Sequence, residues 1–174
     1  YEFRFTPAIN YNRAELDEIQ GVNADPAEGD TRTDDHVGIQ AAFADVHLRN
    51  VGTRYDFDSI RVGVQPFTAD FRGFLFNDSP FGVRLFGNRE NNIYQYNFAW
   101  FRRMEQDTNS GLNDAGEDLR DDDIYVANLY WQDLGVPGFT SQFTLLYNRN
   151  RETDIRYDNN DFIVRPASFG EERP

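Results

Sequence analysis

The stretch IYQYNFAWFRR, residues 93–103, decides the fold class of this chain. Every second position from 94 to 100 is aromatic, and the positions between them are polar or small. Side chains of a β-strand point alternately to opposite faces of its sheet, so this period of two predicts a strand with one aromatic and one mainly polar face. The aromatic positions are Tyr94, Tyr96, Phe98 and Trp100, and the intervening ones are Gln95, Asn97 and Ala99.

The same alternation recurs along the chain and predicts an all-β protein. Several of these stretches run to about ten residues, and a tilted strand needs roughly 9–11 residues to cross a bilayer. A helical period is sustained nowhere. We therefore expect about seven antiparallel strands, with an eighth at 161–166. The other predicted strands are 1–11, 38–49 (where alanines blur the pattern), 60–65, 81–85, 93–103, 125–132 and 141–148.

The connections and the charge favour an antiparallel transmembrane β-barrel. Short turn signals at 52–53, 87–92 and 135–138 alternate with long polar loops at about 14–35 and 105–123, as in outer-membrane barrels. Each long loop holds eight acidic residues and one Arg, so the two account for more than the whole net charge of −13. The remainder of the chain is nearly neutral, and every basic residue is Arg.

Composition also excludes several classes of function. A pI near 4.4 argues against nucleic-acid binding, which needs cations to replace phosphate counterions. The absence of Cys excludes disulfides, thiolate metal sites and Cys nucleophiles. No apolar run reaches 18 residues, which excludes a transmembrane helix. We find no motif of an active site and expect neither an enzyme nor a cofactor.

Alternation alone fits two architectures. In a soluble β-sandwich the aromatic face is the core, whereas in a membrane barrel it meets lipid and the polar face lines a wet lumen. Tyr and Trp near strand ends, the strand length and mid-strand arginines favour the barrel.

Four stretches resemble a group of uncharacterised Gram-negative outer-membrane β-barrel proteins and, more distantly, porin-like alginate-export barrels. They are GVQPFTADFRGFLFNDSPFGVRLFG (63–87), NIYQYNFAWFRRMEQDTNSGLND (92–114), FTSQFTLLYNRNRE (139–152) and IVRPASFG (163–170). The resemblance implies an outer-membrane location. Such proteins are considerably longer than 174 residues, so we expect a single β-barrel segment that forms part of a larger barrel.

Two groups of residues are candidates for a pore lining. The segment Phe71–Asp78 interrupts the strand pattern, and we expect it either to fold into the lumen, with Arg72 and Asp78 shaping a constriction, or to be a tight connection at the membrane rim. An arginine ladder is predicted to attract anions, carboxylated sugars included; alternatively these arginines pair with Glu2, Asp45 and Asp58. The ladder comprises Arg4, Arg61, Arg84, Arg102, Arg103, Arg149 and Arg151.

The acidic segment 107–118 is a weak calcium candidate through Asp107, Asn109, Asn113 and Asp118, although it fails the EF-hand pattern at its fifth, sixth and twelfth positions. The alternative is a solvated surface loop.

The sequence therefore predicts a porin-like channel in the bacterial outer membrane that passes small polar or anionic solutes through an Arg-lined lumen. Its expected partners are the lipid bilayer, lipopolysaccharide, the solutes themselves and other envelope proteins. Two alternatives remain at this point: a scaffold barrel of an envelope assembly, and a secreted β-sandwich that binds carbohydrate.

Overall fold

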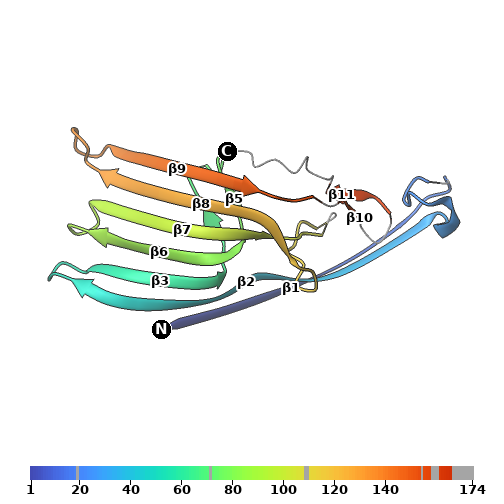
Figure 1. Ribbon diagram of the computed structural model, residues 1–174, viewed down its shortest axis with the longest axis horizontal. Helices are drawn as coiled ribbons and strands as arrows, with labels where there is room; N and C mark the ends of the chain where they lie inside the picture. Colours follow the sequence, from blue (N-terminus) through green and yellow to red (C-terminus); the bar gives the residue numbers. More distant parts are fainter. Residues whose placement is uncertain (19, 71, 108–109, 154, 158–160, 166–174) are drawn as a thin grey trace.

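Seven strands form one antiparallel sheet in the computed structural model, which describes residues 1–18, 20–70, 72–107, 110–153, 155–157 and 161–165. The strand order is β1-β2-β3-β6-β7-β8-β9, so each strand pairs with the next one of the sheet along the chain (Figure 1). The expected all-β, antiparallel fold is confirmed. The strands of this sheet are β1 (Glu2–Glu15), β2 (Thr31–Val51), β3 (Asp56–Val64), β6 (Phe81–Arg89), β7 (Tyr94–Met104), β8 (Leu119–Gln132) and β9 (Thr140–Asn150).

Four short strands lie outside the sheet. β4 (Phe67–Thr68) pairs with β5 (Asn77–Asp78), and β10 (Arg156–Tyr157) pairs with β11 (Ile163–Arg165). The strand expected at 161–166 is therefore a piece of a separate ribbon and not an eighth strand of the sheet. The described residues contain no α-helix, only a 3-10 turn at Pro26–Glu28.

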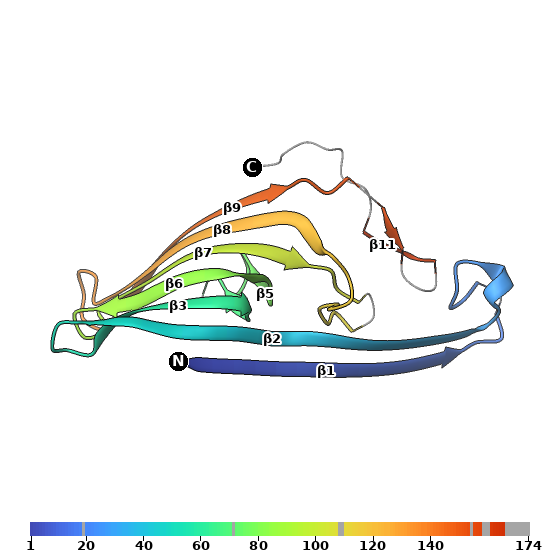
Figure 2. The same ribbon diagram turned by 60° about the horizontal axis from the view of Figure 1, so that its bottom comes forward.

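Several strands, among them β1, β2 and β8, are longer than their sequence patterns suggest. β1 and β2 pair from Glu2–Asp45 to Glu15–Thr31, which leaves a connection of 16–30 where a loop of 14–35 was expected. β2 has 21 residues and projects with β1 beyond the other strands (Figure 2). β8 begins at Leu119, so three acidic residues expected in a loop, Asp121–Asp123, belong to a strand.

The short and the long connections between strands lie at opposite ends of the sheet. The turns between β2 and β3, β6 and β7, and β8 and β9 lie together at one end, on the left of Figure 1, and the longer connections leave from the other. Three successive residues, Glu90–Asn92, have positive φ angles of 53°, 54° and 73°. The carboxylate of Asp56 stabilises this turn because it accepts hydrogen bonds from the backbone N–H groups of Glu90 and Asn91, both at 2.9 Å.

Strand register places the apolar residues on one face, called the apolar face below. Side chains directly opposite each other in neighbouring strands share a face. Trp100 lies between Val83 and Tyr125, and Phe98 lies between Leu85 and Ala127. No described segment packs over this face, and Phe98 is 54% exposed. Two of its rows are Phe3–Ala44–Val62–Val83–Trp100–Tyr125–Tyr147 and Val46–Ile60–Leu85–Phe98–Ala127–Leu145.

The intervening side chains of each strand point to the opposite face of the sheet, called the polar face. One row runs Glu2–Asp45–Arg61–Arg84–Ala99–Val126–Leu146, and another runs His47–Ser59–Phe86–Asn97–Asn128–Thr144. The β4–β5 hairpin lies on this side, beneath the arch of the sheet in Figure 2.

The hairpin supplies the core of the molecule. Phe67 and Ala69 pack with Phe101 and Ile124 of the sheet, and the Phe67 and Phe101 ring centroids are 4.9 Å apart. Gly82, directly opposite Phe101, makes room for this packing, because a Cβ there would lie 2.6 Å from the Phe101 ring and 2.2 Å from the Trp100 carbonyl oxygen. The hairpin therefore converts part of the polar face into a small aromatic core.

Phe101 and Phe98 provide a matched test of the two faces. Phe101 is fully buried beneath the hairpin, so Phe101→Ala is expected to lower the free energy of unfolding by about 3–5 kcal/mol. Phe98→Ala, on the exposed face, is expected to cost about 1 kcal/mol or less. Urea unfolding followed by tryptophan fluorescence measures both, and equal losses would contradict this assignment of faces.

Candidate functional site

The candidate site is the polar face together with the hairpin that crosses it. Hydrogen bonds to one backbone atom fix the inner end of this hairpin. The carbonyl oxygen of Ala69 accepts from the side chains of Asn128 (2.5 Å), Gln142 (2.7 Å) and Thr144 (3.2 Å). Since these donors belong to β8 and β9, while the hairpin connects β3 to β6, the segment reaches across the full width of β6 and β7.

The outer end of the hairpin is held by charge. Asp78 accepts hydrogen bonds from Arg103 Nε at 3.2 Å and Gln106 Nε2 at 3.0 Å. The side-chain amide of Asn113 donates to the carbonyl oxygens of Ser79 (2.6 Å) and of Ile39 in β2 (3.2 Å). Asn113 thus ties the acidic connection between β7 and β8 to both the hairpin and β2.

The turn of the hairpin is organised by Asp70. Its carboxylate accepts backbone hydrogen bonds from Leu75 at 2.7 Å, Arg72 at 2.8 Å and Phe74 at 3.1 Å. These N–H donors, led by that of Leu75, hold the pKa of the Asp70 carboxyl below its usual value, because they stabilise the charged form.

Two of the predicted arginines, Arg61 and Arg84, lie directly opposite each other in β3 and β6. Arg61 pairs with Asp45 at 2.7 Å, while Arg84 Nε donates to the Asn97 side-chain oxygen at 2.7 Å. No ion pair with a carboxylate joins Arg84 to any part of the chain that the structure describes. This pair therefore leaves one positive charge without a matching acid, in a row where like charges repel.

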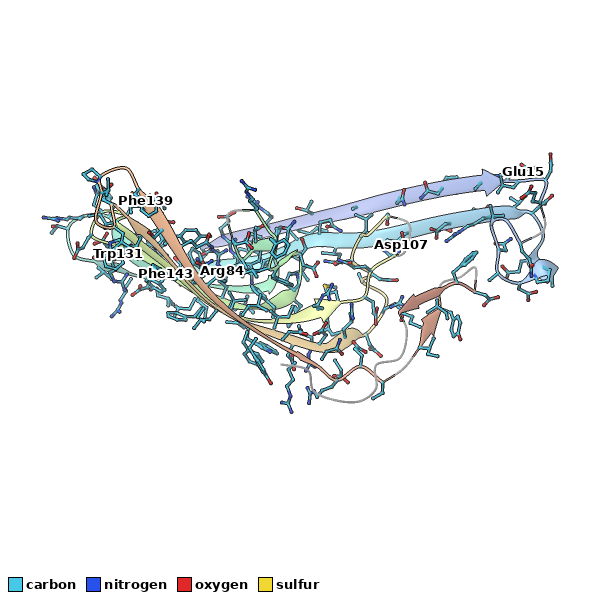
Figure 3. The ribbon with its side chains drawn as sticks, turned by 90° about the horizontal axis from the view of Figure 1, so that it is seen from above. Glu15, Arg84, Asp107, Trp131, Phe139 and Phe143 are labelled. Atoms are coloured by element: carbon cyan, nitrogen blue, oxygen red, sulfur yellow. The ribbon has the colours of Figure 1, made fainter. Side chains whose placement is uncertain are left out.

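The guanidinium groups of Arg61 and Arg84 contact aromatic rings. Arg61 lies 4.2 Å from the Phe43 ring centroid, and Arg84 lies 4.6 Å from that of Phe86 and 5.2 Å from that of Phe67. Cation–π contacts of this kind hold a guanidinium in place without cancelling its charge. Figure 3 shows Arg84 between the two ends of the sheet.

The other candidates on this face take different positions. Arg4 is exposed in the edge strand β1, pairs with Glu2 at 3.5 Å and lies 5.7 Å from the Phe43 ring centroid. Arg72 is exposed in the hairpin turn, and Phe71 lies outside the described residues. Asp78 does not meet Arg72 in an ion pair that the structure records; its partner is Arg103.

The predicted ladder of seven arginines is divided between the two faces. Arg4, Arg61, Arg84 and Arg103 belong to the polar face. Arg102 and Arg149 belong instead to the apolar face, where both lie opposite Asp123 in the row that contains Val64 and Phe81. Arg151 contacts the same Asp123 at 3.2 Å. The predicted pairing is present for two of the three acids, since Arg4 binds Glu2 and Arg61 binds Asp45, whereas Asp58 binds two arginines outside the predicted ladder, Arg49 and Arg89, both at 2.7 Å.

The weak calcium candidates do not form a cluster of ligands. Asp107 accepts from the Ser110 backbone N–H at 2.7 Å, Asn113 is used as described above, and Asp118 is exposed. Asn109 lies outside the described residues. Within the described ranges, no three His, Asp or Glu side chains are placed to hold a metal ion.

The residues that hold the inner end of the hairpin were not found from the sequence. Asn128, Gln142 and Thr144 occupy ordinary polar positions of predicted strands, and nothing in their spacing indicates a common acceptor. The available signal was indirect: Pro66 and the interrupted alternation after it mark a segment that leaves the ladder.

Asp70 gives a pH-dependent prediction. Its folded-state pKa is depressed, so its contribution to hairpin stability is complete above the unfolded pKa of about 3.9 and is lost as pH falls through the folded pKa. Hydrogen exchange at the Leu75 amide should accelerate with acid over that window, relative to a reference peptide. Asp70→Asn should exchange faster at neutral pH and lose this acid dependence, whereas Asp17→Asn should not; an unchanged Leu75 amide in Asp70→Asn would contradict the assignment.

No helix of the described residues is long and apolar enough to cross a membrane. Comparisons with protein-family models, with curated proteins and with solved structures gave no match.

Proposed function

We propose that this chain forms part of the wall of an outer-membrane β-barrel, a porin-like channel that passes small polar or anionic solutes. The observation that carries the proposal is the separation of the two faces. An exposed aromatic face suits lipid, and a polar face with arginines and an inward-folded hairpin suits a water-filled lumen.

The aromatic end of the apolar band supports this proposal. On β7 the outward apolar residues extend from Tyr94 to Trp100, roughly 20 Å along the strand, and the charged Arg102 follows. The apolar band of outer-membrane barrels is about 25 Å tall and is flanked by aromatic girdles. Tyr94 and Trp131, whose ring centroids are 5.2 Å apart, lie at the short-turn end of the band, where Figure 3 shows Trp131.

The strand count favours a segment of a larger barrel. In an antiparallel sheet of seven strands, the first and the last run in the same direction. Antiparallel closure therefore needs an odd number of further strands between β9 and β1, in keeping with the even strand numbers of bacterial barrels.

The sandwich alternative has less support. A sandwich needs a second sheet packed on the apolar face at about 10 Å, and the described residues form only the seven-stranded sheet and two ribbons of two strands. Detergent dependence separates these alternatives. Complete extraction of the folded protein into water without detergent would reject the barrel.

The polar face is expected to select for anions. Arg61→Ala with Arg84→Ala should shift the reversal potential in planar bilayers toward cation preference, because the uncompensated charge of the pair is lost. Arg13→Ala with Arg54→Ala, two exposed arginines away from this face, is the matched control. An unchanged selectivity in the first variant would reject the Arg-lined lumen, and a folded protein without channel events would favour the scaffold alternative.

The hairpin is expected to narrow the pore. Replacing residues 67–78 by a short Gly-Ser turn should raise single-channel conductance, since the segment crosses the polar face from β3 toward β9. The control, Asp70→Asn, keeps the hairpin but weakens the hydrogen bonds of its turn, and it should change the single-channel conductance less. Equal conductance with and without the hairpin would place it outside the conducting path.

A further inference from the structure

The guanidinium group of Arg84 differs from those of the other predicted ladder arginines on the polar face, because it pairs with no acid of the described residues. The Nε atom of Arg84 donates to a neutral acceptor, the Asn97 side-chain oxygen, at 2.7 Å. Each of the other three has a carboxylate partner. The pairs are Arg4–Glu2 at 3.5 Å, Arg61–Asp45 at 2.7 Å and Arg103–Asp78 at 3.2 Å.

The opposed Arg61 does not change the balance of charge around Arg84. Both Nε and Nη2 of Arg61 donate to one oxygen of Asp45, at 3.0 and 2.7 Å. Arg61 and Asp45 therefore add no net charge, although Arg61 lies directly opposite Arg84 and 5.4 Å from the centroid of the Phe86 ring that Arg84 also contacts. The surplus of one positive charge at this place belongs to Arg84.

The terminal nitrogens of Arg84, Nη1 and Nη2, donate to no acceptor in the part of the chain that the structure describes. The remaining contacts of its guanidinium are with the rings of Phe86 and Phe67. A ring face attracts a cation but does not replace an oxygen acceptor, so these contacts leave the terminal N–H groups available. Arg84 is partly exposed, and a solute can therefore reach these donors.

The hairpin places this guanidinium beside the narrowest part of the proposed pore. Phe67 belongs to β4 and is buried in the small aromatic core, and its ring lies 5.2 Å from the Arg84 guanidinium. Arg84 thus lies where the hairpin crosses the polar face. A solute that passes the hairpin along this face meets the free side of Arg84.

We propose that Arg84 binds the carboxylate of an organic anion, with the ring of Phe86 against the carbon skeleton of the ligand. Two terminal nitrogens of a guanidinium donate parallel hydrogen bonds to the two oxygens of a carboxylate, a geometry that a spherical anion cannot use. Phe86 is partly exposed beside them and offers apolar surface. This inference rests on the proposed function where it names organic carboxylates as solutes of the pore.

Nuclear magnetic resonance of the folded protein in detergent micelles tests the site without requiring conduction. The fluorine signal of 4-fluorobenzoate measures affinity, and the Nε–H signal of Arg84, identified by its absence in Arg84→Gln, locates the ligand. We expect saturable binding that shifts the Arg84 signal, with an affinity about ten-fold higher than that of chloride at equal ionic strength, from the second hydrogen bond to a charged group.

Two substitutions beside Arg84 should change the affinity in opposite directions. Asn97→Asp keeps an acceptor for Arg84 Nε but supplies the missing negative charge, and should weaken 4-fluorobenzoate binding about ten-fold or more. Asp45→Asn leaves Arg61 without its acid and should tighten binding about two- to five-fold. Asn12→Asp, at an exposed position of β1, adds the same charge as Asn97→Asp and should leave the affinity unchanged.

A second substitution covers the case in which Asn97→Asp does not fold. Arg84→Lys keeps the positive charge but lacks the planar fork, so it should still bind chloride while losing its preference for 4-fluorobenzoate over chloride. A preference retained in Arg84→Lys would overturn the paired hydrogen bonds and with them the site.

The outcomes separate this inference from the proposed function. A folded protein that conducts but binds 4-fluorobenzoate without saturation, or equally well in Asn97→Asp and Asn12→Asp, would overturn the carboxylate site and leave the channel. A protein that binds as expected but gives no channel events would support the site and reject the pore in which it was placed. Neither binding nor conduction in a folded protein would reject both.

Discussion

The backbone hydrogen-bond ladder of the seven strands is the constraint on which the rest of the structure depends. Because side chains alternate along every strand and stay level with their partners across it, one register assigns every residue of the sheet to a face. A shift of one residue in β7 would exchange Trp100 with Phe101 and put both faces in the wrong environment. The aromatic rows and the polar rows are thus two consequences of a single set of backbone pairings.

The hairpin between β3 and β6 follows from the polar face that it covers. A face of Asn, Gln, Thr and Arg side chains offers donors to a chain segment that lies across it, and the Ala69 carbonyl oxygen receives three of them. The opposition of Gly82 and Phe101 provides a low place in that face where Phe67 can pack. The hairpin is therefore held both by hydrogen bonds from polar side chains and by packing in a small aromatic core. A solvated loop or a connection at the membrane rim would need neither interaction.

A buried carboxylate lies near each end of the sheet. Asp58 and Asp123 are each shared by two arginines that the structure records, and each lies beside an aromatic residue that donates to it, Tyr96 or Trp100. Removing such a carboxylate would leave both of its arginines and its aromatic donor without their common acceptor, which costs more than the loss of one exposed ion pair. Asp123 is thus a structural part of a strand, although its sequence neighbours suggested a solvated loop.

The sequence by itself determined the strands and their two faces, because a period of two depends only on local backbone geometry. It also located the short turns and the break after Pro66. It did not determine the lengths of β1, β2 and β8, whose outer parts carry acids and gain their regularity only from cross-strand pairing. The tertiary structure decided three further features: Arg61 and Arg102 lie on different faces, Asn128 and Gln142 donate to one carbonyl oxygen, and Asp78 pairs with Arg103. Each depends on the register between strands that are distant in the chain.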